Sequence, residues 1–165
     1  MLDVNRTQAA PGTIFLKDYQ PPAWLVDSVD LQFVLNDTAT EVTASLALRR
    51  NPDSAPHPLV LDGDGLELVA VSLDGRLLDD SAYELTDTAL IIPHTPDRCA
   101  ITTVTRINPS ANTSLMGLYL SSGNFCTQCE AEGFRKITYF PDRPDILSIY
   151  TVTILADKDR YPVLL

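Results

Sequence analysis

The sequence has no long apolar run and few basic residues, and each shortage excludes a class of protein. No apolar stretch approaches the roughly 20 residues that a helix needs to cross a bilayer, so we expect no membrane partner. Lys and Arg number 12 against 22 Asp and Glu, which gives a net charge of −10. Nucleic acids and anionic membrane surfaces bind basic patches, and we therefore expect no nucleic-acid partner either.

Targeting signals and cysteines are also scarce. The first residues, MLDVNRTQAAPG, lack the apolar core of a secretory signal. An odd number of cysteines fits a reducing compartment better than a disulfide framework, and the chain has three. The sequence therefore predicts a cytoplasmic protein.

Alternation of apolar and polar residues with a period of two is the dominant pattern. In SVDLQFVLN, the apolar residues Val29, Leu31 and Phe33 fall on one side of an extended chain, and TEVTASLALRR alternates in the same way. Five further runs are rich in β-branched and aromatic residues and are expected to form strands: LELVAVSL, ALII, CAITTVT, FRKITYF and YTVTILA.

Turn signals separate these runs. Asp62–Gly65 and Asp74–Gly75 contain Asp-Gly dipeptides typical of hairpins, and NPDSAPHP is a proline-rich loop. Only RPDILSIY suggests a helix, with Pro144 suited to the first helical position. The sequence predicts one all-β domain over residues 1–165. We expect an antiparallel two-sheet, saddle-like β-sandwich with at most one short helix near residues 143–149.

The segment FCTQCEAEGFRKITYFPDRPD contains a C-x-x-C pair, Cys126 and Cys129. A structural zinc site needs four ligands, and the two histidines, His57 and His94, lie in separate segments. A redox pair is typical of a helix N-terminus in a βαβ unit, which this sequence lacks. If the segment is extended, residues three apart point to opposite sides, so the spacing favours neither use.

The same geometry brings a different pair together. Gln128 and Glu130 are two residues apart, so an extended chain presents both on one face. An amide oxygen beside a carboxylate suits an ammonium group, which has three donors and no acceptor. On spacing alone, two solvated strand residues remain the favoured interpretation.

The run CTQCEAEGFRKITYFPDRPDILSIYTVTILADKDRYPVLL, with INPSANTSLMGLYLSSGNFC before it, closely resembles the N-terminal domain of the bacterial aminopeptidase N family of zinc-dependent gluzincins. The resemblance covers nearly the whole chain and is most specific over residues 108–165. It implies a β-rich module that packs against a thermolysin-like catalytic domain. It also implies that Gln128 and Glu130 bind the free α-amino group of the substrate, together with a glutamate of that catalytic domain, and this overturns the solvated-residue interpretation.

The family's H-E-x-x-H and G-A-M-E-N motifs are absent from all 165 residues. We therefore expect no catalytic residue and no metal ligand in this chain, and zinc only in a parent enzyme. The chain ends at RYPVLL, so the resemblance implies a piece of a longer protein that lacks the last strands of its domain. We expect residues 1–165 alone to be inactive.

The expected function is that of the substrate-anchoring N-terminal domain of a zinc metalloaminopeptidase, which releases N-terminal amino acids from peptides. Its partners would be the catalytic domain of the same polypeptide and peptides with a free N-terminus. The alternative is an independent β-sandwich binding or scaffolding module without peptidase activity. The resemblance places Arg135, Asp142 and Arg143 in a structural joint near the catalytic domain, where packing and ion pairing are favoured over substrate contact. Cys99 is expected in the core as a small buried residue. Four aromatic residues are expected in the core or in a domain interface: Tyr119, Phe134, Tyr139 and Phe140.

Overall fold

The computed structural model describes residues 15–163 and consists mainly of strands joined by turns and short 3-10 helices. The strands are β1 (Trp24–Val34), β2 (Thr40–Arg50), β3 (Leu59–Asp62), β4 (Glu67–Leu73), β5 (Arg76–Leu77), β6 (Glu84–Leu85), β7 (Ala89–Ile92), β8 (Arg98–Ile107), β9 (Gly117–Ser121), β10 (Asn124–Gln128) and β11 (Ile149–Leu155). The 3-10 helices are η1 (Leu16–Asp18), η2 (Asp80–Ala82), η3 (Pro109–Ala111) and η4 (Phe134–Lys136). Within the described residues, no helix has the length and apolar character needed to cross a bilayer.

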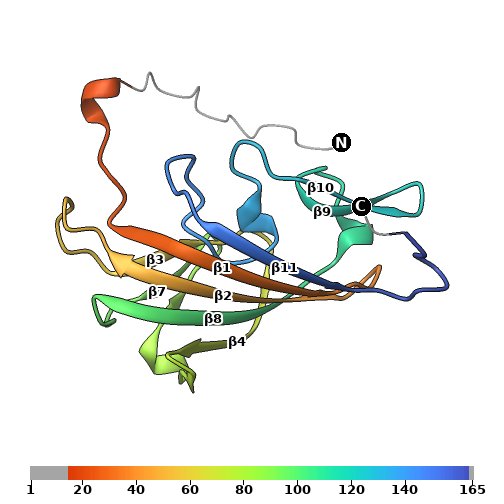
Figure 1. Cartoon of the computed structure of the whole chain (residues 1–165), viewed down its shortest axis with the longest axis horizontal. Helices are drawn as coiled ribbons and strands as arrows, with labels where there is room; N and C mark the ends of the chain where they lie inside the picture. The colour runs from red at the N-terminus through yellow and green to blue at the C-terminus, as the bar shows by residue number, and fades with distance from the viewer. Residues whose placement is uncertain (1–14, 164–165) are drawn as a thin grey trace, which may run out of the picture.

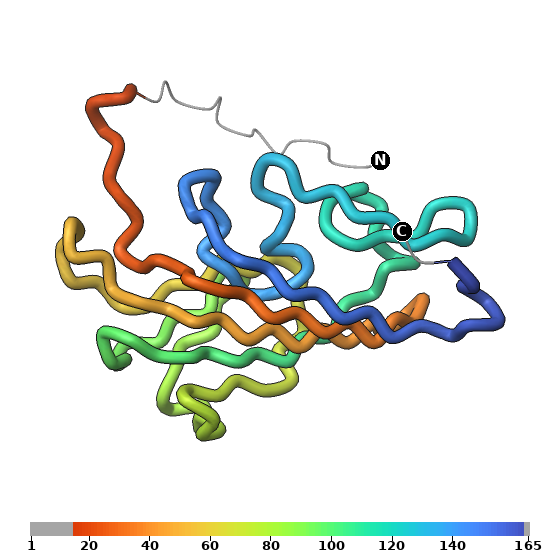
Figure 2. Tube along the Cα trace, viewed as in Figure 1, coloured from red at the N-terminus to blue at the C-terminus, as the bar shows by residue number. Residues whose placement is uncertain are grey.

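The strands form three sheets (Figure 1). The largest has the order β11-β1-β2-β8-β4-β5, the second has the order β3-β7-β6, and the hairpin β9–β10 is the third. The pairings are antiparallel except that of β1 with β11, which is parallel. Figure 2 shows these two segments side by side although they lie at opposite ends of the described chain.

The core lies between the six-stranded and three-stranded sheets, because inward-facing residues of both belong to one cluster of buried hydrophobic side chains. In β2 every second side chain from Thr40 to Leu48 is buried, as the period-two pattern predicts. Leu46 from the large sheet and Leu61 and Leu90 from the small sheet are all fully buried. The all-β sandwich is confirmed.

The two Asp-Gly turns have different outcomes. Asp74 and Gly75 form the two-residue turn of the β4–β5 hairpin, with φ of 50° and 78°, as a type I′ turn requires. Asp62–Gly65, in contrast, joins β3 of the small sheet to β4 of the large sheet. This segment is a crossover between sheets, so the hairpin expected there is wrong.

Two other expectations of secondary structure need correction. FRKITYF is not a strand: it begins as η4 and ends with a single bridge between Phe140 and Asp62. Its residues 137–140 are all buried, so the apolar run marks a connector inside the core. Residues 143–149 form no helix: Asp145 accepts hydrogen bonds from the Arg143 guanidinium and the Tyr19 hydroxyl, and the chain then extends into β11.

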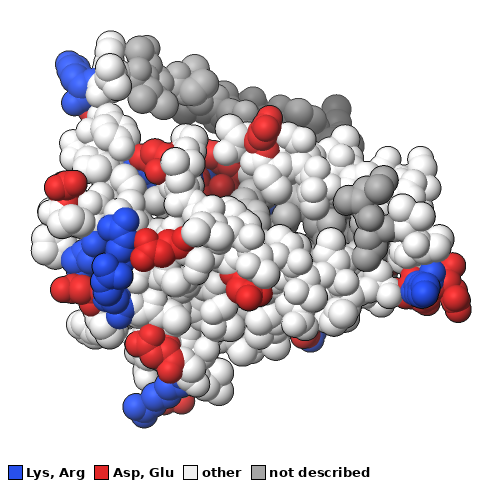
Figure 3. Space-filling model, viewed as in Figure 1, with Lys and Arg blue, Asp and Glu red and all other residues white. Residues whose placement is uncertain are grey.

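Strand β11 lies at the edge of the large sheet and exposes every residue. Its side chains Tyr150, Val152 and Ile154 continue the stripe formed by Val29, Leu31 and Phe33 of β1, against which they are paired. The β1 residues are buried, whereas the three β11 residues are 40–52% exposed. Figure 3 shows that the viewed face, on which β1, β2, β8 and β11 run, is largely uncharged. The half-exposed apolar side chains of β11, rather than the absence of charge, are the feature typical of an interface.

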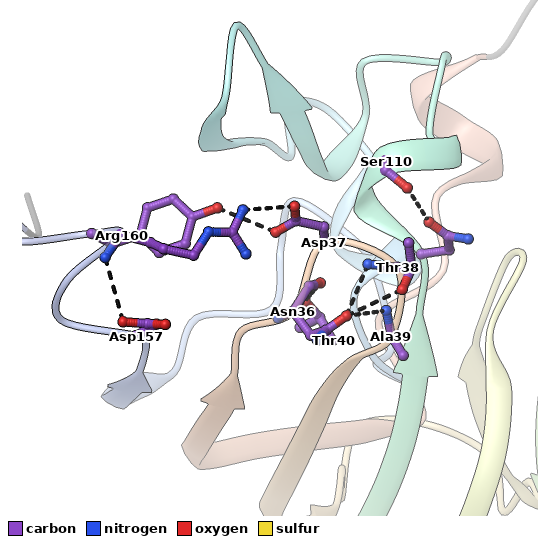
Figure 4. Close-up of polar contacts among 10 residues, drawn as sticks. Asn36, Asp37, Thr38, Ala39, Thr40, Ser110, Asp157 and Arg160 are labelled. Carbon is purple, nitrogen blue, oxygen red and sulfur yellow. Dashed lines mark hydrogen bonds and ion pairs between the residues drawn. The ribbon is translucent and has the colours of Figure 1, made fainter.

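The segment that follows β11 is attached to the turn between β1 and β2 (Figure 4). The Asp37 carboxylate accepts from Arg160 Nη2 at 2.8 Å and from the Tyr161 hydroxyl at 3.2 Å. The hydrogen bond from Arg160 is the main reason that the pKa of Asp37 lies below its ordinary value. The Tyr161 ring also lies 5.1 Å from the Phe125 ring, so this segment joins the large sheet to β10.

Candidate functional site

The hairpin β9–β10 positions the candidate residues. Its two-residue turn is Ser122–Gly123, with φ of 51° and 83°, which again matches a type I′ turn. Gln128 is the last residue of β10 and is paired with Gly117 of β9. A Ser-Gly dipeptide between two apolar runs is the sequence signal that could have predicted this hairpin.

Gln128 and Glu130 lie next to each other at the end of β10. Both side chains are exposed, and Gln128 Nε2 donates to the main-chain oxygen of Glu130 at 3.5 Å. The chain is extended only as far as Gln128, and residues 130–133 form a turn, so the extended conformation expected through Glu130 is wrong. Among residues 15–163, no Lys, Arg or His side chain forms an ion pair with Glu130. Its carboxylate is available to a cation.

The turn after Glu130 closes at Gly133. Its N–H donates to the carbonyl oxygen of Cys129 at 2.8 Å. A Cβ atom at this position would lie 2.8 Å from the main-chain oxygen of Gln128, 2.9 Å from Cys129 Cα and 2.8 Å from Met116 Cε. Two of these three atoms belong to the backbone, so the turn requires a residue without a side chain here. Neither Gly133 nor Met116 was singled out from the sequence.

A charged network follows the turn. Arg135 of η4 donates through Nε to Asp142 Oδ2 at 3.0 Å and through Nη2 to the main-chain oxygen of Asp142 at 3.0 Å. Its Nη2 also lies 3.2 Å from Glu132 Oε2. Burial lowers the pKa of Arg135, but the hydrogen bond with Asp142 and the charges of Asp62, Asp142 and Glu132 outweigh burial, so the pKa is raised. The ion pairing favoured for Arg135, Asp142 and Arg143 is present: Arg135 pairs with Asp142, and Arg143 pairs with Asp145.

Aromatic rings lie beneath the same turn. The Phe134 ring is 4.9 Å from the Phe140 ring in an edge-to-face arrangement and 6.0 Å from the ring of Tyr150 in β11. Tyr139 and Phe140 are buried, as expected, and Phe134 packs against the core. The rings connect the turn to the edge strand of the large sheet.

The cysteines take no part in a shared centre. Cys126 and Cys129 are both free thiols, and Cys99 is a buried residue of β8, as expected. Burial, with a smaller contribution from Asp142, raises the pKa of Cys129 above its ordinary value. Across residues 15–163, no three His, Cys, Asp or Glu side chains come together as a group that could hold a metal ion.

Cys99 gives a test of the core packing. Burial, together with the charge of Asp74, raises the pKa of the Cys99 thiol to about 11 from 9.0. The protonated thiol stabilises the fold fully below about pH 9, and this contribution is lost as the pH rises towards 11. Because the thiolate is the nucleophile, we expect iodoacetamide at pH 8 to alkylate Cys99 about 100-fold more slowly than an ordinary thiol. Mass spectrometry of tryptic peptides measures the rate, and an equal rate in the native and unfolded proteins would contradict the buried position.

The chain is similar to known proteins over nearly its whole length. The profile of the Peptidase M1 N-terminal domain matches residues 21–164. Aminopeptidase N of Caulobacter vibrioides is 48% identical over 94% of this chain, and that of Escherichia coli is 43% identical over 94%. In both cases the chain spans 18% of the relative's length.

Solved structures agree with this relationship. The crystal structure of Legionella pneumophila aminopeptidase A in complex with aspartic acid has a TM-score of 0.84 and 38% identity. The match covers 91% of this chain and 18% of that one. An M1 zinc metallopeptidase of Deinococcus radiodurans shares the fold at 16% identity, with a TM-score of 0.64 over 80% of this chain and 32% of that one. The chain therefore belongs to the peptidase M1 N-terminal domain family.

Proposed function

We propose that this domain is the substrate-anchoring part of a zinc aminopeptidase and that Gln128 and Glu130 bind the free α-amino group of the peptide. One observation carries the proposal: both side chains are exposed, the Gln128 amide reaches the main chain of Glu130, and Glu130 has no cationic partner among residues 15–163. The names of the Caulobacter and Escherichia relatives, aminopeptidase N, support the activity of the parent enzyme.

The chemistry of the pair suits this task. An α-ammonium group offers three donors, and the Gln128 amide oxygen and Glu130 carboxylate are acceptors. Hydrogen bonds to a charged group each contribute about 1.5–3 kcal/mol, and more as water is excluded. A blocked N-terminus supplies no positive charge and leaves the Glu130 carboxylate unpaired, so the same contact selects free N-termini over internal peptide bonds.

Hydrolysis itself requires groups that this chain does not provide. The H-E-x-x-H motif is absent from the sequence, and the described residues contain no group that could hold a metal ion. In the proposed parent enzyme, zinc bound to another domain supplies Lewis-acid activation of water and carbonyl. The contribution of Gln128 and Glu130 is positioning, because fixing the amine fixes the distance to the first peptide carbonyl.

The catalytic domain of the same polypeptide is the proposed partner. The exposed apolar side chains of β11, Tyr150, Val152 and Ile154, form a surface suited to it. The half-exposed Tyr150 ring also contacts Phe134 next to the anchoring turn, so the same contact would bring Glu130 close to the interface.

Three free thiols support a cytoplasmic parent enzyme. The Caulobacter, Escherichia and Legionella relatives carry aminopeptidase names, which disfavours an independent binding module.

The test uses the complete polypeptide that carries this domain. We expect it to release p-nitroaniline from L-alanine p-nitroanilide and to leave the N-acetylated anilide intact, while residues 1–165 alone release nothing from either. The acetyl group removes the ammonium charge and also adds bulk, so the two anilides test the requirement for a free amine, and Glu130→Gln tests the partner of that amine. Equal hydrolysis of both anilides, or hydrolysis by residues 1–165 alone, would refute the proposal.

A further inference from the structure

We propose that Arg135 and Asp142 are positioning residues that hold the turn bearing Glu130 in place against the core. This inference rests on the proposed function, because it concerns the residues that support the amine-binding pair. It starts from a continuous set of contacts that runs from strand β3, through Asp142 and Arg135, to the turn.

The fixed end of these contacts is Asp62, the last residue of β3. Its N–H donates to the Phe140 oxygen at 2.8 Å and its own oxygen accepts from the Phe140 N–H at 3.1 Å. Its side chain accepts from the main-chain N–H of Asp142, with 3.0 Å to Oδ2. Asp142 is only 7% exposed, so a strand of the core determines the position of a buried carboxylate.

The carboxylate of Asp142 then fixes Arg135. Its Oδ2 accepts from both the main-chain N–H and the Nε of Arg135, each at 3.0 Å, so backbone and side chain are held by one oxygen. The third bond, from Arg135 Nη2 to the Asp142 main chain at 3.0 Å, leaves the planar guanidinium with one orientation. Lysine could not make this set of bonds, because its ammonium has no second nitrogen in a fixed plane.

Arg135 is connected in two ways to the turn that bears Glu130. Its Nη2 pairs with Glu132, two residues beyond Glu130, at 3.2 Å. Its main chain belongs to η4, which begins directly after Gly133, and Gly133 is in close contact with Gln128 and Cys129. A shift of η4 would therefore move both anchoring residues.

The charges give a second reason for the arrangement. Arg135 is a cation close in sequence to a carboxylate that is proposed to bind an ammonium group. Paired with Asp142 and Glu132, its charge is compensated by two anions. Without Asp142, the guanidinium keeps an ion pair only with the exposed Glu132, and it is then free to turn towards Glu130 and compete with the substrate for that carboxylate.

The experiment uses Asp142→Asn and Arg135→Met in the complete polypeptide and measures inhibition constants for two probes. L-Leucine carries the α-amino group, whereas acetohydroxamate binds zinc without an amine. We expect both variants to bind L-leucine about ten- to a hundredfold more weakly, as misplacement of the anchor by a fraction of an ångström predicts, and to bind acetohydroxamate as the wild type does. Arg135→Lys, which keeps the charge and loses the planar contacts, is expected to resemble Arg135→Met.

Asp145→Asn is the matched control, because Asp145 pairs with Arg143 at 2.7 Å in the same segment, and its side-chain hydrogen bonds go to Arg143 and Tyr19, not to η4. We expect it to bind both probes normally.

Wild-type L-leucine binding in both Asp142→Asn and Arg135→Met, with binding lost in Glu130→Gln, would overturn this inference and leave the proposed function standing. Equal weakening of both probes would show a general structural role and overturn it as well. Normal L-leucine binding in Glu130→Gln would refute the proposed function itself. If Asp142→Asn does not fold, the two Arg135 variants decide.

Discussion

Glu130→Gln in the complete polypeptide is expected to lower kcat/KM for L-alanine p-nitroanilide by about 100- to 1,000-fold. Glutamine has nearly the same size and keeps one acceptor oxygen, so the change removes mainly the negative charge. An ammonium left without its carboxylate in a closed site loses about 3–4 kcal/mol of stabilisation, and each 1.36 kcal/mol is tenfold in rate. Initial rates over a range of substrate concentrations measure the effect.

Whether kcat or KM changes in Glu130→Gln is as informative as the size of the loss in kcat/KM. An anchor that binds substrate and transition state equally raises KM, whereas one that also orients the carbonyl lowers kcat, and we expect both changes. Glu84→Gln is the control, because Glu84 is an exposed residue of β6, away from the hairpin. Wild-type kinetics for Glu130→Gln would show that another group recognises the amine.

Local periodicity predicted the strands whose two faces differ. In β1, β2 and β8 one face is buried and the other is partly or fully exposed, so alternation in the sequence marks the core side. The same rule failed for FRKITYF, because its last residues are buried on every side and no alternation can distinguish a buried connector from a strand. The parallel pairing of β11 with β1 joins residues about 120 positions apart, which no local pattern contains.

The candidate site, like the fold, could be predicted from the sequence only in part. Spacing predicted Gln128 and Glu130 on one face only for a chain extended through Glu130, and the structure has a turn there, so the assignment of the pair depends on the family resemblance. Ion pairing was favoured for Arg135, Asp142 and Arg143 without naming their partners, and the structure pairs Arg135 with Asp142 and Arg143 with Asp145. The role of Asp62 could not be predicted, because it depends on a bridge between residues 62 and 140. The constraint on Gly133 likewise depends on how tightly the turn closes, and a lone glycine in a sequence does not show this.

Gly133→Ala is expected to lower kcat/KM for the anilide by about 100-fold. The backbone at Gly133 has φ of −101° and ψ of −8°, a conformation that alanine adopts without strain, so the effect comes from space alone. The added methyl group meets the Gln128 oxygen at 2.8 Å and Cys129 Cα at 2.9 Å. Met116 is able to move away, but these backbone atoms move only if the end of β10 shifts, and that displaces both anchoring side chains.

Gly75→Ala separates this local displacement from a simple loss of stability. Gly75 has φ of 78°, and a methyl group added there would meet no atom within 4 Å, so alanine costs about 1–2 kcal/mol of backbone strain without a clash. Overpacking at Gly133 costs a similar amount, about 1–3 kcal/mol. The two variants should therefore have similar thermal unfolding temperatures. Their kinetics should differ, because KM rises for Gly133→Ala and stays at the wild-type value for Gly75→Ala. Equal KM values in both would mean that the turn tolerates the methyl group, and that the position of Glu130 does not depend on the close contact between Gly133 and β10.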